Sequence, residues 1–205
     1  KLSRRTSVEL DVAGALTEVT ELAGQKLADL VLINDKDQTY AKLRFDDRSI
    51  ATMKSHLGTL DDSLARGLIW ASLWDSCRDG ELSTSDYVAI ALNALKTESD
   101  ISIVAATYLQ FETAIWAYAN PAKRDGLRAQ VADATAAMLA TAAPGSDHQM
   151  QFAKAFANNA ITPAHMEKLK AILNGSENGL VIDAEIRWYI FICGVKRGVF
   201  SVADI

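Results

Sequence analysis

The pattern of hydrophobic and polar positions changes near residue 46. Before that point, apolar residues alternate with polar ones or form short runs, in segments 8–12, 16–19, 30–33 and 39–45. Alternation with a period of two is typical of half-buried strands, so these segments predict short β-strands joined by turns. After residue 46 the apolar positions recur with the 3.6-residue period of an amphipathic helix. The pattern therefore divides the chain into a strand-forming segment and a helical remainder.

Turn and capping residues divide the helical remainder into eight predicted helices. Their ranges are 47–57, 62–79, 83–96, 100–119, 121–142, 146–159, 162–174 and 183–197. Thr162 and Asp183 are typical N-cap residues, and Pro163 suits the first helical position. Short polar links between the helices favour a mainly α fold of stacked antiparallel pairs, in a HEAT-like or armadillo-like array, although no fixed sequence repeat is visible.

The two ends of the chain suggest an excised fragment. A few short strands cannot bury a hydrophobic core, so the N-terminal ones must pack on the helices or belong to a sheet that is mostly absent. The chain begins with Lys1 rather than methionine. Near the other end, Ser201 and Asp204 have the spacing of a capping box, as though another helix were starting. We therefore expect the C-terminus to be truncated.

Composition excludes several classes of protein. The chain has 205 residues, a net charge of −5, 49% hydrophobic residues and 23% charged residues. Nucleic-acid binding needs clustered lysine and arginine, so the net charge argues against it. No apolar run approaches the roughly 20 residues of a membrane span. The two cysteines, Cys77 and Cys193, lie in apolar helical sequence and are expected to be buried free thiols in a reducing cytoplasm.

No catalytic motif is present. The three histidines, His56, His148 and His165, are far apart, and none belongs to a His-Glu-x-x-His pair of the kind that binds catalytic zinc. There is also no Gly-x-Ser-x-Gly motif and no phosphate-binding loop. The residues therefore predict neither a catalytic site nor a metal site within this chain.

One helix carries three candidate site residues. Trp70 and Trp74 are four positions apart and share a helical face, and Arg78 follows one turn later. In the simpler interpretation this face packs on another helix and Arg78 forms a surface pair with Asp75. In the functional interpretation the face is a wall of a substrate chamber.

The last predicted helix carries the fourth candidate, Arg187. It lies one turn after Asp183, near Glu185, and can reach a neighbouring helix as an interhelical clamp. A guanidinium can also bind a carboxylate through two hydrogen bonds, so Arg187 is alternatively a binder of a peptide carboxylate. A further aromatic set favours core packing over a ligand cage: Tyr108, Phe111, Trp116 and Tyr118.

Four segments resemble bacterial aminopeptidase N. Residues 30–49, with Asn34-Asp35 and Thr39-Tyr40-Ala41-Lys42, are similar to the segment that leads from the family's β-sandwich domain into its helical domain. Residues 64–81 resemble the family's second helix and exit turn. Residues 97–100 resemble its Ser-Glu-x-Asp turn with Thr97 in place of serine, and 183–188 its Asp-x-x-Leu-Arg-Trp helix start with Ile186 in place of leucine. The resemblance covers nearly the whole chain.

The resemblance implies a domain organisation. Residues 1–46 would be strands left from a β-sandwich domain, and residues 47–205 a helical C-terminal domain truncated at its C-terminus. The parent would be a cytoplasmic zinc metallopeptidase, a hydrolase. Its catalytic motifs belong to an earlier domain and have no counterpart here. No catalytic residue is therefore carried over, and zinc is expected in the parent and not in this fragment.

The resemblance also implies a role. This domain would cap the active-site chamber and control the access of peptides, with no activity of its own. Its partners would be the missing catalytic domain of the same chain and the parent's peptide substrates. Trp70, Trp74, Arg78 and Arg187 are the candidate chamber residues. The alternative is a HEAT-like protein-interaction module, which a large exposed apolar patch on the concave face would favour.

Overall fold

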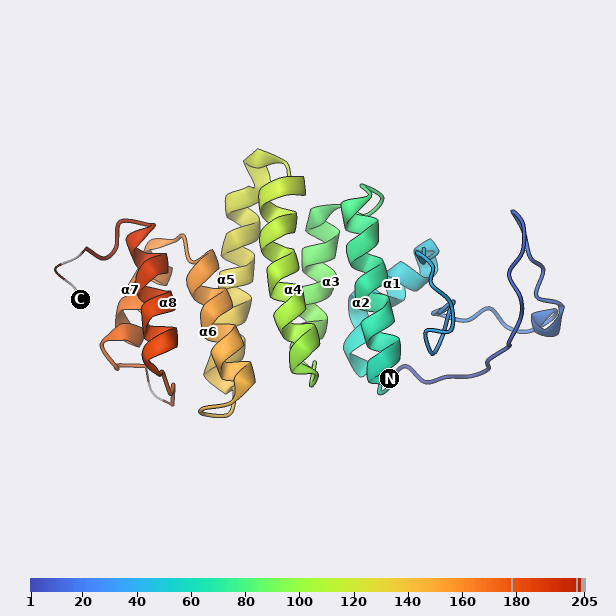
Figure 1. The fold of residues 1–205 in the computed structure, drawn as a ribbon, viewed down its shortest axis with the longest axis horizontal. Coiled ribbons are helices and arrows are strands. Elements are labelled where there is room, and N and C mark those ends of the chain that lie inside the picture. Colours follow the sequence, from blue (N-terminus) through green and yellow to red (C-terminus); the bar gives the residue numbers. More distant parts are fainter. Residues whose placement is uncertain (178, 202, 204–205) are drawn as a thin grey trace.

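The computed structural model describes residues 1–177, 179–201 and 203. In this part of the chain, eight α-helices follow an irregular N-terminal segment and stand side by side in an elongated row (Figure 1). Their bounds are α1 Asp47–His56, α2 Ser63–Arg78, α3 Thr84–Leu95, α4 Ile101–Thr113, α5 Arg124–Thr141, α6 Asp147–Asn159, α7 Pro163–Leu173 and α8 Ala184–Val195. All eight predicted helices are therefore present.

Side-chain caps begin most of the helices. The residue before the helix accepts a hydrogen bond from a backbone N–H of the first turn, which satisfies a donor that has no partner inside the helix. The capping residues are Asp46, Asp62, Ser83, Asp100, Ser146, Thr162 and Asp183. The predicted caps at Thr162 and Asp183 are confirmed. The capping-box spacing at the C-terminus involves Asp204, which lies outside the described residues.

Two predicted helices differ from the structure at the turn that joins them. The helix predicted at 100–119 is α-helical only to Thr113, and residues Ala114–Tyr118 form a π-turn. The helix predicted at 121–142 begins as a 3-10 turn, Pro121–Lys123, before α5 starts at Arg124.

The predicted N-terminal strands are absent: residues 1–46 contain no strand and only a 3-10 turn at Thr20–Leu22. A strand exists only when a second strand satisfies its backbone groups, and this segment has none. The turn expected between segments 30–33 and 39–45 is present, since Asn34, Lys36 and Asp37 have positive φ angles of 58°, 68° and 55°. The Asn34 side chain holds it by accepting a hydrogen bond from the N–H of Thr39 at 2.8 Å.

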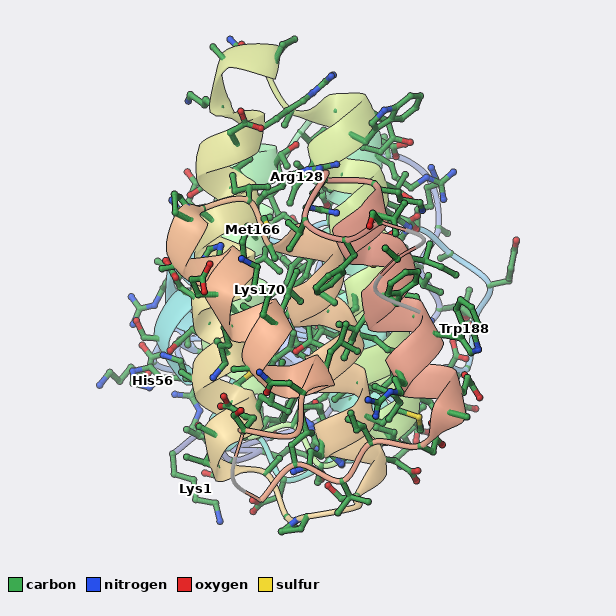
Figure 2. The ribbon with its side chains drawn as sticks, turned by 90° about the vertical axis from the view of Figure 1, so that its left-hand side faces the viewer. Lys1, His56, Arg128, Met166, Lys170 and Trp188 are labelled. Carbon is green, nitrogen blue, oxygen red and sulfur yellow. The ribbon has the colours of Figure 1, made fainter. Side chains whose placement is uncertain are left out.

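The helices form two layers. One layer contains the even-numbered helices, in which α2 contacts α4, α4 contacts α6 and α6 contacts α8. Behind it lies a second layer, in which α1 contacts α3 and α3 contacts α5 (Figure 1). Seen along the row, Lys170 of α7 and Trp188 of α8 lie on opposite sides (Figure 2). Pairs such as α5–α6 and α7–α8 pack across the layers. Within the described residues, no helix is long and apolar enough to cross a membrane.

The core is a continuous apolar cluster between the two layers. Tyr87 of α3 and Phe111 of α4 are fully buried and pack edge to face with ring centroids 6.1 Å apart. Cys77 and Cys193 are buried free thiols, as predicted, and burial raises the pKa of each.

A buried ion pair links helices that are far apart in the sequence. The side chains of Arg66 in α2 and Glu98 in the α3–α4 turn are 8% and 1% exposed. Two hydrogen bonds join them, from Arg66 Nε to Glu98 Oε2 at 2.9 Å and from Arg66 Nη2 to Glu98 Oε1 at 2.8 Å. The N–H of Asp100 and the indole N–H of Trp70 also donate to this carboxylate, at 3.0 Å and 3.4 Å. Every charged oxygen is therefore satisfied, as burial of a carboxylate requires.

The surroundings keep Glu98 ionised. Burial by itself raises the pKa of a carboxyl, because the charged form loses its hydration. Here the hydrogen bonds from Arg66 and from the Asp100 N–H, the charge of Arg66 and the bond from Trp70 outweigh burial, so the pKa of Glu98 lies below its ordinary value. The folded state therefore favours the carboxylate.

Removal of the Glu98 charge should strongly destabilise the fold. In Glu98→Gln the Arg66 guanidinium stays buried without a counter-ion, which typically costs about 3–5 kcal/mol. Urea denaturation at pH 7 measures this difference. The matched control is Glu167→Gln, which breaks the exposed pair with Lys170 and should change stability by less than about 1 kcal/mol. Equal losses in the two variants would contradict a special role for the buried pair.

The contribution of Glu98 should also depend on pH. Its folded pKa is lowered, so its stabilisation is present above the unfolded-state pKa of about 4.3 and is lost as the pH falls through the folded value. The difference in unfolding free energy between wild type and Glu98→Gln should therefore be constant from pH 6 to 8 and shrink below about pH 4. A difference that grows on acidification would contradict this assignment.

Candidate functional site

The three candidates on α2 lie along one stripe that runs from the core to the surface. Trp70 is 4% exposed and its indole N–H donates to Glu98. Trp74, one turn later, is half-buried between Tyr87 and Tyr118, with ring centroids at 5.7 Å and 6.1 Å. Arg78 is exposed and lies 3.6 Å from Asp75, the surface pair expected from the sequence. The stripe thus joins a buried structural end to an accessible cationic end.

Arg78 lines an open groove of about 470 Å³ at the edge of the row where α2 and α4 end. One wall is the turn from α2 to α3, and the other is the turn from α4 to α5. The polar side chains that line it are Arg78, Ser83, Thr84, Ser85, Tyr118, Asn120 and Lys123. Two of these are cations, and the lining contains no carboxylate. The groove therefore suits an anionic or hydrogen-bond-accepting group of a ligand.

The π-turn shapes one side of this groove. Its closing bond runs from the Ala119 N–H to the Ala114 carbonyl at 2.9 Å, five residues back instead of four. Single π-turns inside helices are rare and occur often at functional sites. Tyr118 ends the π-turn against Trp74, while Trp116 is 69% exposed. The sequence favours core packing for four aromatic residues of this region. Tyr108 and Phe111 are buried as expected, whereas Trp116 and Tyr118 are exposed.

The structure does not bring Arg187 to this groove. Helix α8 is separated from α2 by α4 and α6 (Figure 1). Arg187 Nη2 donates to the carbonyl of Leu173, the last residue of α7, at 2.9 Å. Glu185, on the same helix, binds Lys154 of α6 at 2.7 Å. The expected interhelical clamp is therefore present, and the guanidinium keeps further donors for a ligand.

The histidines do not form a zinc site. His148 Nε2 lies 3.1 Å from the carbonyl oxygen of Glu98, and His165 caps α7 and contacts Asp133 at 2.8 Å. His56 lies in the last turn of α1. Within the described residues no three histidine, cysteine or acidic side chains are grouped as metal ligands. The residues present therefore do not fit a catalytic zinc ion.

Substitution of a buried tryptophan and of an exposed tryptophan should have very different effects on folding stability. Trp70→Ala removes a buried ring and a hydrogen bond to Glu98 and should cost about 3–5 kcal/mol of folding stability. Trp116→Ala, the matched control, removes an exposed ring and should change stability by less than about 0.5 kcal/mol. Chemical denaturation measures both. A large loss for Trp116→Ala would mean that the π-turn depends on this ring for its structure.

Two comparisons with known proteins agree with this architecture. The sequence profile of the ERAP1-like C-terminal domain family matches residues 30–205. Aminopeptidase N of Streptomyces lividans is 45% identical over 190 residues, which cover 92% of this chain and 22% of that protein. The chain thus spans about a fifth of its relative's length and corresponds to one domain of a larger aminopeptidase. The resemblance to the helical domain of aminopeptidase N is confirmed, and the chain belongs to the ERAP1-like C-terminal domain family.

Proposed function

We propose that this chain is the non-catalytic C-terminal domain of a cytoplasmic zinc aminopeptidase, capping the active-site chamber and controlling the access of peptides. The main support for this proposal is the match of residues 30–205 to the ERAP1-like C-terminal domain family, together with the 45% identity to an aminopeptidase N. Zinc would be held by the parent's catalytic domain, since His148 and His165 are engaged in structural contacts here and His56 is exposed on α1, far along the chain from both. Residues 1–46 would come from the preceding β-sandwich domain, and 47–205 would form the helical domain.

The architecture supports a cap. The two layers suit a HEAT-like array, in which one layer presents a continuous surface to a partner. Large exposed apolar side chains occur on the layer of α2, α4 and α8. They are Leu64, Leu109, Trp188, Ile192 and Val195. Exposed apolar positions of this kind are typical of a surface that contacts another part of a protein. The catalytic domain of the same chain is the partner that the family membership favours.

The groove supports contact with peptides. Arg78 and Lys123 supply positive charge, and Tyr118 and Trp74 supply flat apolar surface beside it. An extended peptide offers carbonyl oxygens, a terminal carboxylate and side chains that suit such a surface. Arg187 would contact the substrate or the partner at the far end of the row. The alternative, an independent interaction module, has no comparison in its favour.

The isolated chain should not hydrolyse aminopeptidase substrates. The measurement is turnover of a panel of aminoacyl fluorogenic substrates with added zinc. No turnover is expected, because no catalytic group is assembled in the described residues. Zinc-dependent turnover that survives repurification would overturn the non-catalytic role.

A chimera tests the cap directly. This chain replaces the corresponding 190-residue stretch of the Streptomyces aminopeptidase N, and Arg78→Ala is introduced. If Arg78 contacts peptides, KM for peptides of several residues should rise severalfold, while hydrolysis of single aminoacyl substrates stays unchanged. The control is Arg48→Ala on α1, which removes an exposed ion pair between Arg48 and Asp29 of the N-terminal segment. Equal effects of Arg78→Ala and Arg48→Ala would contradict a substrate contact at the groove.

A further inference from the structure

Three consecutive residues of the N-terminal segment dock on the exit turn of α2. Lys42 Nζ lies 2.8 Å and 3.2 Å from the two carboxylate oxygens of Asp79. Arg44 bridges two acids, with Nη2 on Asp79 and Nε on Glu81. Between these cations, Leu43 is buried, with 7% of its surface exposed. Three ion pairs and one buried apolar side chain therefore hold the same short stretch of backbone.

The charges of this contact support one another. The hydrogen bond from Lys42 is the largest cause that lowers the pKa of Asp79, and Arg44 adds to it. Burial lowers the pKa of the Arg44 guanidinium, but its bonds to Glu81 and Asp79 outweigh burial and raise it. The contact thus stabilises the charged forms of Asp79 and Arg44. Because Asp79 is shared, loss of this one carboxylate removes a partner from both cations.

The chain on the C-terminal side of this contact is fixed as well. Asp46 caps α1 by accepting from the Ser49 N–H at 3.0 Å and from its hydroxyl at 2.6 Å. Ser49 is buried, and its Oγ accepts the N–H of Val31 at 3.1 Å. On the N-terminal side, Tyr40 is fully exposed. The N-terminal segment is therefore attached both to the end of α2 through residues 42–44 and to α1 through Val31.

We propose that residues 42–44 and the exit turn of α2 form an electrostatic clamp that, together with the contact of Val31 with α1, fixes the orientation of the N-terminal segment on the helical array. Exposed ion pairs are weak singly and are screened by salt. The clamp is therefore reversible and salt-sensitive. If the chain is one domain of a larger aminopeptidase, as proposed above, the clamp would also set the angle between the helical domain and the domain before it. This part of the inference rests on the proposed function.

Asp79→Asn tests the clamp in the intact chain. Asparagine keeps the size and the helix-ending position of Asp79 but removes the charge shared by Lys42 and Arg44. Amide hydrogen exchange at residues 40–46 should become severalfold faster, and trypsin should cleave faster after Lys42 and Arg44. The matched control is Asp75→Asn, one turn earlier on α2, whose partner Arg78 is not part of the clamp. It should leave both rates unchanged.

Salt and a second variant complete the test. In wild type, raising NaCl from 0.15 M to 1 M shortens the screening length from about 8 Å to about 3 Å and should speed exchange at 40–46, while Asp79→Asn should respond little. The midpoint of helix unfolding should stay unchanged. If Asp79→Asn lowers that midpoint, Glu81→Gln removes a clamp contact outside α2 and should still accelerate exchange at 40–46. Equal rates in Asp79→Asn, Asp75→Asn and wild type, or no effect of Glu81→Gln, would overturn the clamp.

Discussion

The bidentate contact between Arg66 and Glu98 is the interaction on which the arrangement of the first helices depends. Arg66 Nη1 also donates to the carbonyls of Leu60 and Asp61, at 2.7 Å and 3.0 Å, and so holds the link that enters α2. On the other side, His148 of α6 contacts the backbone carbonyl of Glu98. A guanidinium has a fixed planar geometry, so all of these bonds form in only one register of α2 against the α3–α4 turn. Burial of the two charges carries a desolvation penalty, but their fixed hydrogen-bond geometry favours a single arrangement of α2 against the α3–α4 turn.

The sequence predicts those parts of the fold that local interactions determine. The eight helices and the caps at Thr162 and Asp183 follow from periodicity and from residues within three positions of a helix start. The strands were wrong because pairing needs a partner strand that composition cannot supply. The partnership of Arg66 with Glu98 spans 32 residues, and no local rule reveals it, although an arginine within the apolar face of a helix was an available signal.

The candidate site shows the same division. Helical spacing places Trp70, Trp74 and Arg78 on one stripe, and the structure agrees. The groove beside Arg78 was not predictable, because its second wall comes from the turn after α4, about 40 residues further along the chain. Helices α2 and α4 belong to one layer and run in the same direction, so the turns that follow them lie side by side on the same edge of the row. The contact of Trp74 with Tyr118 joins these turns, so the groove has the rigidity of packed aromatic rings.

Helix α2 is thus fixed at both ends by charge and in the middle by aromatic packing. Its first turn is held by a buried pair that resists salt, whereas its exit turn carries exposed pairs that salt can screen. The difference in burial gives the two ends different roles. The buried pair stabilises the packing of α2 against the α3–α4 turn, and the exposed pairs form the proposed clamp on the segment before the helices. Arg78, which lines the groove, is the sequence neighbour of Asp79, which binds Lys42 and Arg44. The groove and the proposed clamp therefore use neighbouring residues of one helix end.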